Sequence, residues 1–169
     1  GGNFLSATPD TEYTAQAMQK CDMIVQVSTK LNRNHLIHGK TSLILPCLGR
    51  TEIDAQESGK QFVSVENSAG IVHKTEGSKT PASRHLMSES KIVAELAKAT
   101  LVFSNRVHWS ELSSNYDRIR DLIEKTIPGF ENFNLRVRKN GGFYLPNEAR
   151  EGKFNTSSTR AHFTTNELS

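Results

Sequence analysis

The sequence predicts an α/β protein with a Rossmann-like, mostly parallel sheet and flanking helices, followed by the start of a β-rich domain. Two short apolar segments, 23–27 and 42–46, have the character of strands that are buried on both faces of a parallel sheet. A helical pattern over 10–21 comes directly before the first of them, and a helix followed by a strand is half of a βαβ unit. After residue 133, short strand-like segments between glycine and proline turns predict a β-rich part.

The composition bounds the class of protein and its partners. Of the 169 residues, 36% are hydrophobic and 23% are charged, which suits a soluble chain, and the net charge of +3 is too weak to imply nucleic acid. No apolar run approaches the roughly 20 residues of a membrane span. Cys21 and Cys47 form no CxxC pair, so we expect buried, reduced thiols in a cytoplasmic protein and no zinc or iron–sulfur site within this segment. His35 and His38 lack a third ligand nearby and are expected to face solvent.

The first ten residues combine a glycine-rich turn with a helix start. Gly1 and Gly2 allow a tight turn and a close backbone approach, and Asn3 adds a side-chain amide. Thr8 is the predicted N-cap, with Pro9 at the first helical position. Such a loop holds phosphates in α/β proteins, although an ordinary loop before a helix fits the same residues. Because a turn of this kind should follow a strand, we expect the chain to be a fragment of a longer protein.

Two polar loops follow the predicted strands at their carboxyl ends, where open α/β sheets bind ligands. The first loop is dense in hydroxyls, amides and cations, and it includes Ser28, Thr29 and Asn32. These groups suit a phosphate, a ribose or a base edge, and a solvated polar loop is the alternative. The second loop carries Arg50 and Glu52, which form either a weak surface ion pair or part of a second ligand loop.

The middle of the chain predicts a hairpin and then a helix. Segments 61–65 and 70–73 read as strands on either side of a turn, and an extended connection follows over 74–84. A helix is predicted over 89–103, with Ser88 as its N-cap.

A second helix is predicted over 115–127, where Pro128-Gly129 stops it, and Trp109, Phe130 and Phe133 are expected to pack around the helices. The sequence contains no G-x-S-x-G motif, and no Ser, His and Asp spacing specifies a triad, so no catalytic residue is predicted. The residues alone therefore predict the part of an α/β protein that binds a nucleotide-like ligand.

Several stretches, in order along essentially the whole chain, carry a resemblance. They are GGNF (1–4), ATPDT (7–11), VQVSTKLNR (25–33), LPCLGRTE (45–52), VENS (65–68), YDRIRD (116–121), IPGF (127–130) and GGFYLPN (141–147). Together they resemble the large subunits of molybdopterin oxidoreductases, in the branch of the formate dehydrogenase-like alpha subunits. Single stretches are weak signals, whereas the ordered set is specific.

The resemblance implies an oxidoreductase with two-electron chemistry at molybdenum or tungsten, held by molybdopterin guanine dinucleotide, and it names formate only as a family label. It implies that the first turn lies near the phosphates of one dinucleotide and that the loop after the first strand recognises its guanosine. An iron–sulfur cluster in an upstream part, the missing domains of the same chain and an electron-transfer partner are further expectations. The cofactor-binding candidates are Gly1, Gly2, Asn3, Ser28, Thr29, Asn32, Arg50, Glu52 and Asn67.

The resemblance also divides the chain. Residues 1–133 are expected to be the truncated cofactor-binding α/β portion, and 134–169 a linker with the start of a dinucleotide-binding β-barrel. The family's metal ligand lies upstream, so this piece alone is expected to be inactive, and its strands are expected to leave an apolar sheet edge exposed.

Two departures from the family pattern stand out. Val27-Ser28 replace an acidic residue, and Thr159 replaces a glycine at a position where a positive φ would disfavour a side chain. A stand-alone nucleotide-binding α/β domain without redox activity is the alternative hypothesis, followed by a thiamine-diphosphate-type domain.

Overall fold

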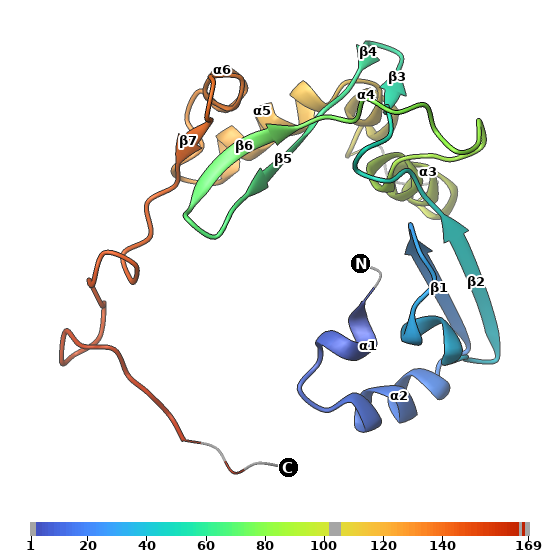
Figure 1. Cartoon of the computed structure of the whole chain (residues 1–169), viewed down its shortest axis with the longest axis horizontal. Coiled ribbons are helices and arrows are strands. Elements are labelled where there is room, and N and C mark those ends of the chain that lie inside the picture. Colours follow the sequence, from blue (N-terminus) through green and yellow to red (C-terminus); the bar gives the residue numbers. More distant parts are fainter. Residues whose placement is uncertain (1–2, 102–105, 166, 168–169) are drawn as a thin grey trace. The chain divides into compact units, whose positions relative to one another are not determined.

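The chain folds into two compact units. The computed structural model describes residues 3–101, 106–165 and 167. Unit 1 comprises Gly1–Gln61 and Glu76–Asn115, and unit 2 comprises Phe62–Thr75 and Tyr116–Ser169. Helices and strands occur in both units, which confirms the predicted α/β class (Figure 1). The predicted domain boundary after residue 133 stays a prediction about the longer protein; in this structure Phe133 begins a helix of unit 2.

Unit 1 is built on one parallel pair of strands. The pair consists of β1 (Met23–Ser28) and β2 (Thr41–Pro46), with Ser28 opposite Pro46 at the carboxyl ends. The two strands lie side by side in Figure 1, preceded by α1 (Phe4–Ala7) and α2 (Thr11–Gln19). The single-turn helix η1 (Arg33–Leu36) lies between them in sequence. A short antiparallel pair, β3 (Ala55–Gln56) with β4 (Gly59–Lys60), follows.

The prediction that these strands are buried on both faces is wrong for most of β2. Leu43 and Ile44 are each 46% exposed and Leu45 is 36% exposed. In β1, Gln26 and Ser28 are buried, whereas Val25 is exposed. Each strand has only one partner strand among the described residues. Parallel sheets are usually covered on both faces, and this pair alone leaves much apolar surface in solvent.

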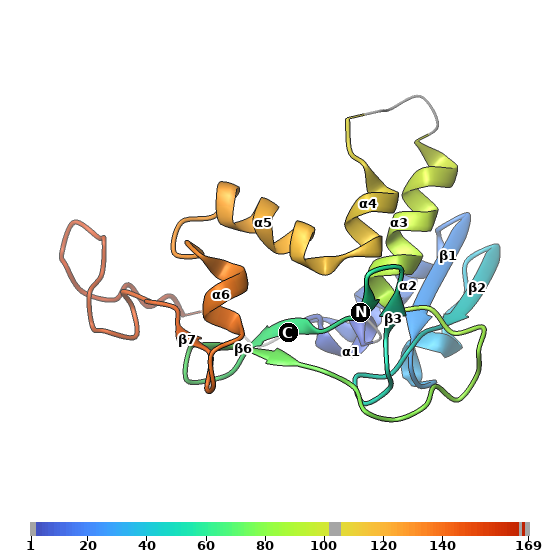
Figure 2. The same cartoon turned by 90° about the horizontal axis from the view of Figure 1, so that it is seen from above.

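The helices of unit 1 begin at local capping residues. The N-cap of α2 is Asp10, whose carboxylate accepts from the backbone N–H of Tyr13 at 2.8 Å, so the prediction of Thr8 is wrong. The hydroxyl of Thr8 instead donates to the carbonyl of Leu5. Ser88 caps α3 (Glu89–Thr100) as predicted; the last predicted residues of that helix, 102–103, lie outside the described residues. Figure 2 shows α3 beside α4 (Trp109–Ser114).

Unit 2 is a three-stranded antiparallel sheet with two helices. The strand order is β5 (Val63–Glu66), β6 (Ile71–Thr75) and β7 (Phe143–Tyr144), and the predicted hairpin is confirmed as β5–β6. The helices are α5 (Tyr116–Thr126) and α6 (Phe133–Val137).

The core of unit 2 is a small aromatic and aliphatic cluster. Val72, Phe133 and Val137 are almost fully buried at its centre. The rings of Phe130 and Phe133 meet edge to face with centroids 4.8 Å apart, and those of Phe133 and Phe143 with centroids 5.8 Å apart. The predicted packing of Phe130 and Phe133 is therefore confirmed.

Parallel pairing is confined to β1 and β2 among the strands that the structure describes, so the expectation of a mostly parallel sheet needs correction. Short turns join β3 to β4 and β5 to β6 and return the chain antiparallel to itself, whereas β7 pairs with β6 after a long connection that contains α3 to α6. The described residues after β7 contain no strand, and the start of a β-barrel over 134–169 stays a prediction about the longer protein. No helix in the described part of the chain has the length and apolar character needed to cross a membrane.

Candidate functional site

The loops after β1 and β2 leave the same edge of the parallel pair. Ser28 and Pro46 are register partners at the two carboxyl ends, and the backbone N–H of Cys47 donates to the carbonyl of Ser28 at 3.2 Å. The polar segments 29–32 and 48–51 therefore start beside one another. In α/β sheets this edge is where nucleotides bind.

Side chains within the first loop hold its shape. The hydroxyl of Ser28 donates to the carbonyl of Lys30 at 2.7 Å. The amide oxygen of Asn32 accepts from the backbone N–H of Asn34 at 2.9 Å, and the backbone N–H of Asn32 donates to Nδ1 of His35 at 2.9 Å. Ser28 and Asn32 thus build the loop, while the side chain of Thr29 is exposed to solvent.

A buried amide pair ties α1 to this loop. Nδ2 of Asn34 donates to Oε1 of Gln26 at 2.7 Å, and Nε2 of Gln26 donates to the carbonyl of Asn34 at 3.1 Å. The remaining oxygen of Asn34 accepts from the backbone N–H of Leu5 at 3.1 Å. Asn3, the N-cap position of α1, is exposed and makes no side-chain capping bond. The structure therefore brings two predicted site segments together, the one with Asn3 and the one with Asn32.

Glu52 fixes the second loop rather than pairing with Arg50. Its Oε2 accepts from the backbone N–H of Gly49 and its Oε1 from the backbone N–H of Ala82, each at 2.6 Å. These two hydrogen bonds hold the pKa of Glu52 below its ordinary value. An added side chain at Gly77 would overlap the backbone of Glu52, so the chain can pass there only as glycine.

The cations around these loops are exposed. Lys30, Arg33 and Arg50 form no ion pair with any residue that the structure describes. At the opposite edge, Lys40 is paired with Asp22 at 2.6 Å. Cations without carboxylate partners among the described residues, on the two loops of which one carries the hydroxyl of Thr29, suit a phosphate-bearing ligand.

His35 is buried, and the prediction that it faces solvent is wrong. It is 6% exposed because Asn32 and Asn34 draw the η1 turn against β1. When Nδ1 accepts from Asn32, the ring proton is on Nε2, and Nε2 is buried without a hydrogen-bond partner among the described residues. A buried donor without an acceptor costs about 1–3 kcal/mol of folding free energy. An acceptor from a bound ligand at Nε2 of His35 would remove this cost.

The two cysteines differ in their exposure to solvent. Cys47 is buried, and burial together with the nearby charge of Glu89 raises the pKa of its thiol. Cys21 is free but exposed, so the expectation that both thiols are buried is wrong for Cys21, which lies just beyond the end of α2. No cluster of three metal-ligating side chains occurs in the described ranges.

Asn67 belongs to unit 2, whereas the other described candidates belong to unit 1. Its amide oxygen accepts from the backbone N–H groups of Ala69 and Ile71, at 3.0 and 3.1 Å, and so shapes the β5–β6 turn. Gly1 and Gly2 lie outside the described residues. The cofactor contacts of all these residues stay predictions.

Sequence reasoning missed three contributors to this edge. Lys30 and Arg33 were visible only as members of a polar loop, and Gln26 looked like one polar residue in an apolar strand. A lone glutamine inside such a strand is a signal of a buried hydrogen-bond partner.

Thr159, which stands where the family pattern has a glycine, has a positive φ. Its φ is +55°, a region that β-branched residues rarely adopt. The turn is held by the backbone bond from Thr159 N–H to the carbonyl of Thr156 at 3.0 Å.

Comparisons with known proteins align almost the whole chain with one part of longer proteins. The chain is 47% identical over 169 residues to an uncharacterized oxidoreductase of Mycobacterium tuberculosis, covering 99% of this chain and 22% of that protein. It is 46% identical over 165 residues to the protein YdeP of Escherichia coli, covering 98% of this chain and 22% of that protein. The chain thus spans about a fifth of the length of these relatives. No family model and no solved structure matches it.

Proposed function

We propose that this chain is part of the cofactor-binding portion of a larger oxidoreductase, and that it helps to bind molybdopterin guanine dinucleotide. The observation that carries the proposal is the edge where β1 and β2 end, where a hydroxyl and unpaired cations stand on adjoining loops. The oxidoreductase class is supported by the name of the mycobacterial relative. The molybdopterin assignment is supported by the ordered sequence resemblance.

The hydroxyl and the cations at this edge suit the diphosphate group of a nucleotide. In this proposal Thr29 and Arg50 contact the cofactor, with Lys30 and Arg33 supplying further positive charge. Ser28, Asn32 and Glu52 position the two loops through their bonds to the backbone. When bound, the cofactor would supply the metal for two-electron chemistry. This chain's own residues bind and orient it.

The test uses the full native protein, purified and assayed for molybdenum, tungsten and guanine nucleotide released by acid. We expect guanine nucleotide together with one of the two metals. The variant Arg50→Gln should lower the retained nucleotide about tenfold, the effect of losing one charge-assisted hydrogen bond. Lys40→Gln is the matched control, since Lys40 lies at the opposite edge of the same sheet in an exposed ion pair.

Two results would overturn the proposal. One is a correctly folded protein with neither metal nor guanine nucleotide. The other is an Arg50→Gln variant that keeps the same nucleotide content as the Lys40→Gln control. A guanine nucleotide without metal would instead favour the nucleotide-binding domain without redox activity.

A further inference from the structure

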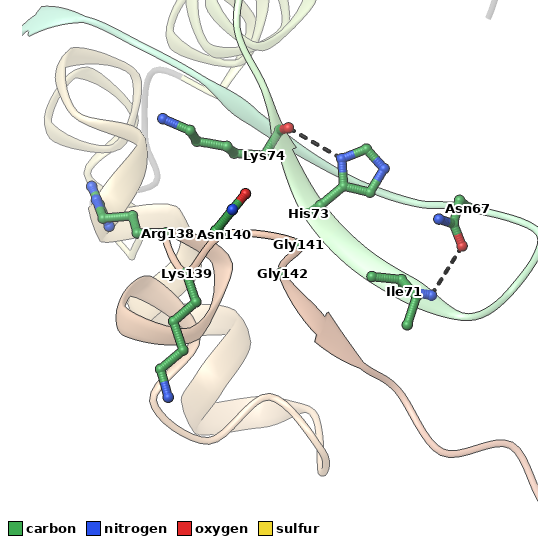
Figure 3. Close-up of a pocket in the computed structure, with 9 residues that line it drawn as sticks. All are labelled: Asn67, Ile71, His73, Lys74, Arg138, Lys139, Asn140, Gly141 and Gly142. Carbon is green, nitrogen blue, oxygen red and sulfur yellow. Dashed lines mark hydrogen bonds between the residues drawn. The ribbon is translucent and has the colours of Figure 1, made fainter.

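Unit 2 contains a cavity that the proposed function does not use. It has a volume of about 580 Å³ and lies between the β5–β6 hairpin and the turn before β7 (Figure 3). A volume of this size falls in the range of pockets for small molecules. The residues that line it are Asn67, Ile71, His73, Lys74, Arg138, Lys139, Asn140, Gly141 and Gly142.

The charged residues of the lining are all cations. Three lining residues are cations, Lys74, Arg138 and Lys139, and none of the nine is acidic. In Figure 3, Asn140 points from the turn toward β6, where His73 and Lys74 lie. The side chain of Lys139 has no hydrogen bond or ion pair with any described residue.

The carboxylate that pairs with Arg138 is shared between two guanidinium groups. Both oxygens of Asp117 accept from Nη2 of Arg138 at 2.6 Å, and one also accepts from Arg120. One negative charge therefore faces the two positive charges of Arg120 and Arg138, and the ammonium group of Lys139 adds to that excess. An excess of positive charge around a concave site attracts anions.

The turn that closes the cavity depends on glycine. Gly141 and Gly142 have φ of +80° and +71°, and the N–H of Gly142 donates to the carbonyl of Lys139 at 2.9 Å. A side chain at Gly142 would overlap the carbonyl of Val72 on β6. This close approach keeps the turn, with Lys139 and Asn140, against the strand that carries Lys74.

We propose that this cavity binds the phosphate groups of a small phosphorylated molecule. Lysine ammonium groups bind phosphate as point charges, and the amide of Asn140 supplies a further donor. The proposal does not rest on the function proposed above, because the cavity belongs to unit 2 and the cofactor edge to unit 1.

The test is calorimetric titration of the full native protein with inorganic pyrophosphate. We expect saturable binding that weakens as salt is added. Lys139→Gln should weaken it about tenfold, and Asn140→Asp, which places a carboxylate in the cavity, by more. Lys125→Gln is the matched control, because Lys125 is an exposed lysine of the same unit that does not line the cavity. Thermal unfolding of each variant checks that the fold is kept.

The proposal is overturned if pyrophosphate binding is absent or does not saturate. Equal affinity in Lys139→Gln and Lys125→Gln, or tighter binding of citrate than of pyrophosphate, would overturn it as well. Guanine nucleotide content, measured on the same Lys139→Gln protein, separates the two proposals: we expect it to be unchanged.

Discussion

At the scale of single residues, Asp117 organises the charged surface of unit 2. Its carboxylate bonds Arg120 and Arg138, whose guanidinium carbons lie 3.9 and 4.9 Å from the centroid of the Phe62 ring. Burial alone would raise the pKa of Asp117, but the hydrogen bonds from the two arginines outweigh it and lower the pKa. Arg120 is itself buried, so it depends on this partner.

Replacing Asp117 by Asn should reduce the free energy of unfolding by about 1–2 kcal/mol at neutral pH. Because the pKa is lower in the folded state, the stabilisation is complete above the unfolded value of about 3.9 and is lost as the pH falls through the folded value. The difference between the two proteins in urea unfolding should therefore shrink below about pH 4. Lys125→Gln, at an exposed lysine of the same helix with no hydrogen bond or ion pair to a described residue, should change stability by less than about 0.5 kcal/mol. A difference that is independent of pH would contradict this account.

At the scale of elements, the β6–β7 pairing depends on the conformation and the lack of a side chain at Gly142. The side chain of Gly142→Ala would be strained by the positive φ and would also overlap the carbonyl of Val72. The side chain of Gly141→Ala would be strained by the positive φ alone, because the space around it is open. We expect Gly141→Ala to lower the free energy of unfolding by about 1 kcal/mol, and Gly142→Ala to lower it by at least about 1–2 kcal/mol more. Urea unfolding measures both losses, and amide exchange on β6 locates the second. Equal losses would show that the strand and the turn are not in the close contact described.

At the scale of the whole molecule, the uncovered parallel pair should make the isolated 169-residue chain associate. Leu43 and Leu45 lie on one face of β2 and Ile44 on the other, and all are exposed. Sedimentation velocity should show concentration-dependent association, and Leu43→Lys combined with Leu45→Lys should reduce it. Leu135→Lys is the control, because Leu135 is a single exposed leucine on α6. A chain that stays monomeric at high concentration would contradict the prediction.

The three longest helices, α2, α3 and α5, and the parallel pair could be predicted because their signals are local. Ser88 bonds a backbone N–H only three positions later, and the apolar segments of β1 and β2 carry their strand character within five or six residues. The polar loops after them were located for the same reason, since the carboxyl end of a strand is a position in the sequence. The hairpin of unit 2 likewise needed only a turn between two strand-like segments.

The sequence by itself therefore determined the α/β class, the approximate positions of the three longest helices and the positions of the two polar loops that we propose as a ligand site. Only the tertiary structure decided which side chains of those loops are free to bind. The carboxylate of Glu52 accepts a hydrogen bond from the backbone N–H of Ala82, 30 residues away in the sequence. The side-chain oxygen of Asn34 accepts one from the backbone N–H of Leu5, 29 residues away. His35 is buried by the same packing, and the cavity of unit 2 joins β6 to a turn that lies more than 60 residues later. Such contacts depend on the three-dimensional path of the chain, which the residues adjacent to each partner in the sequence do not specify.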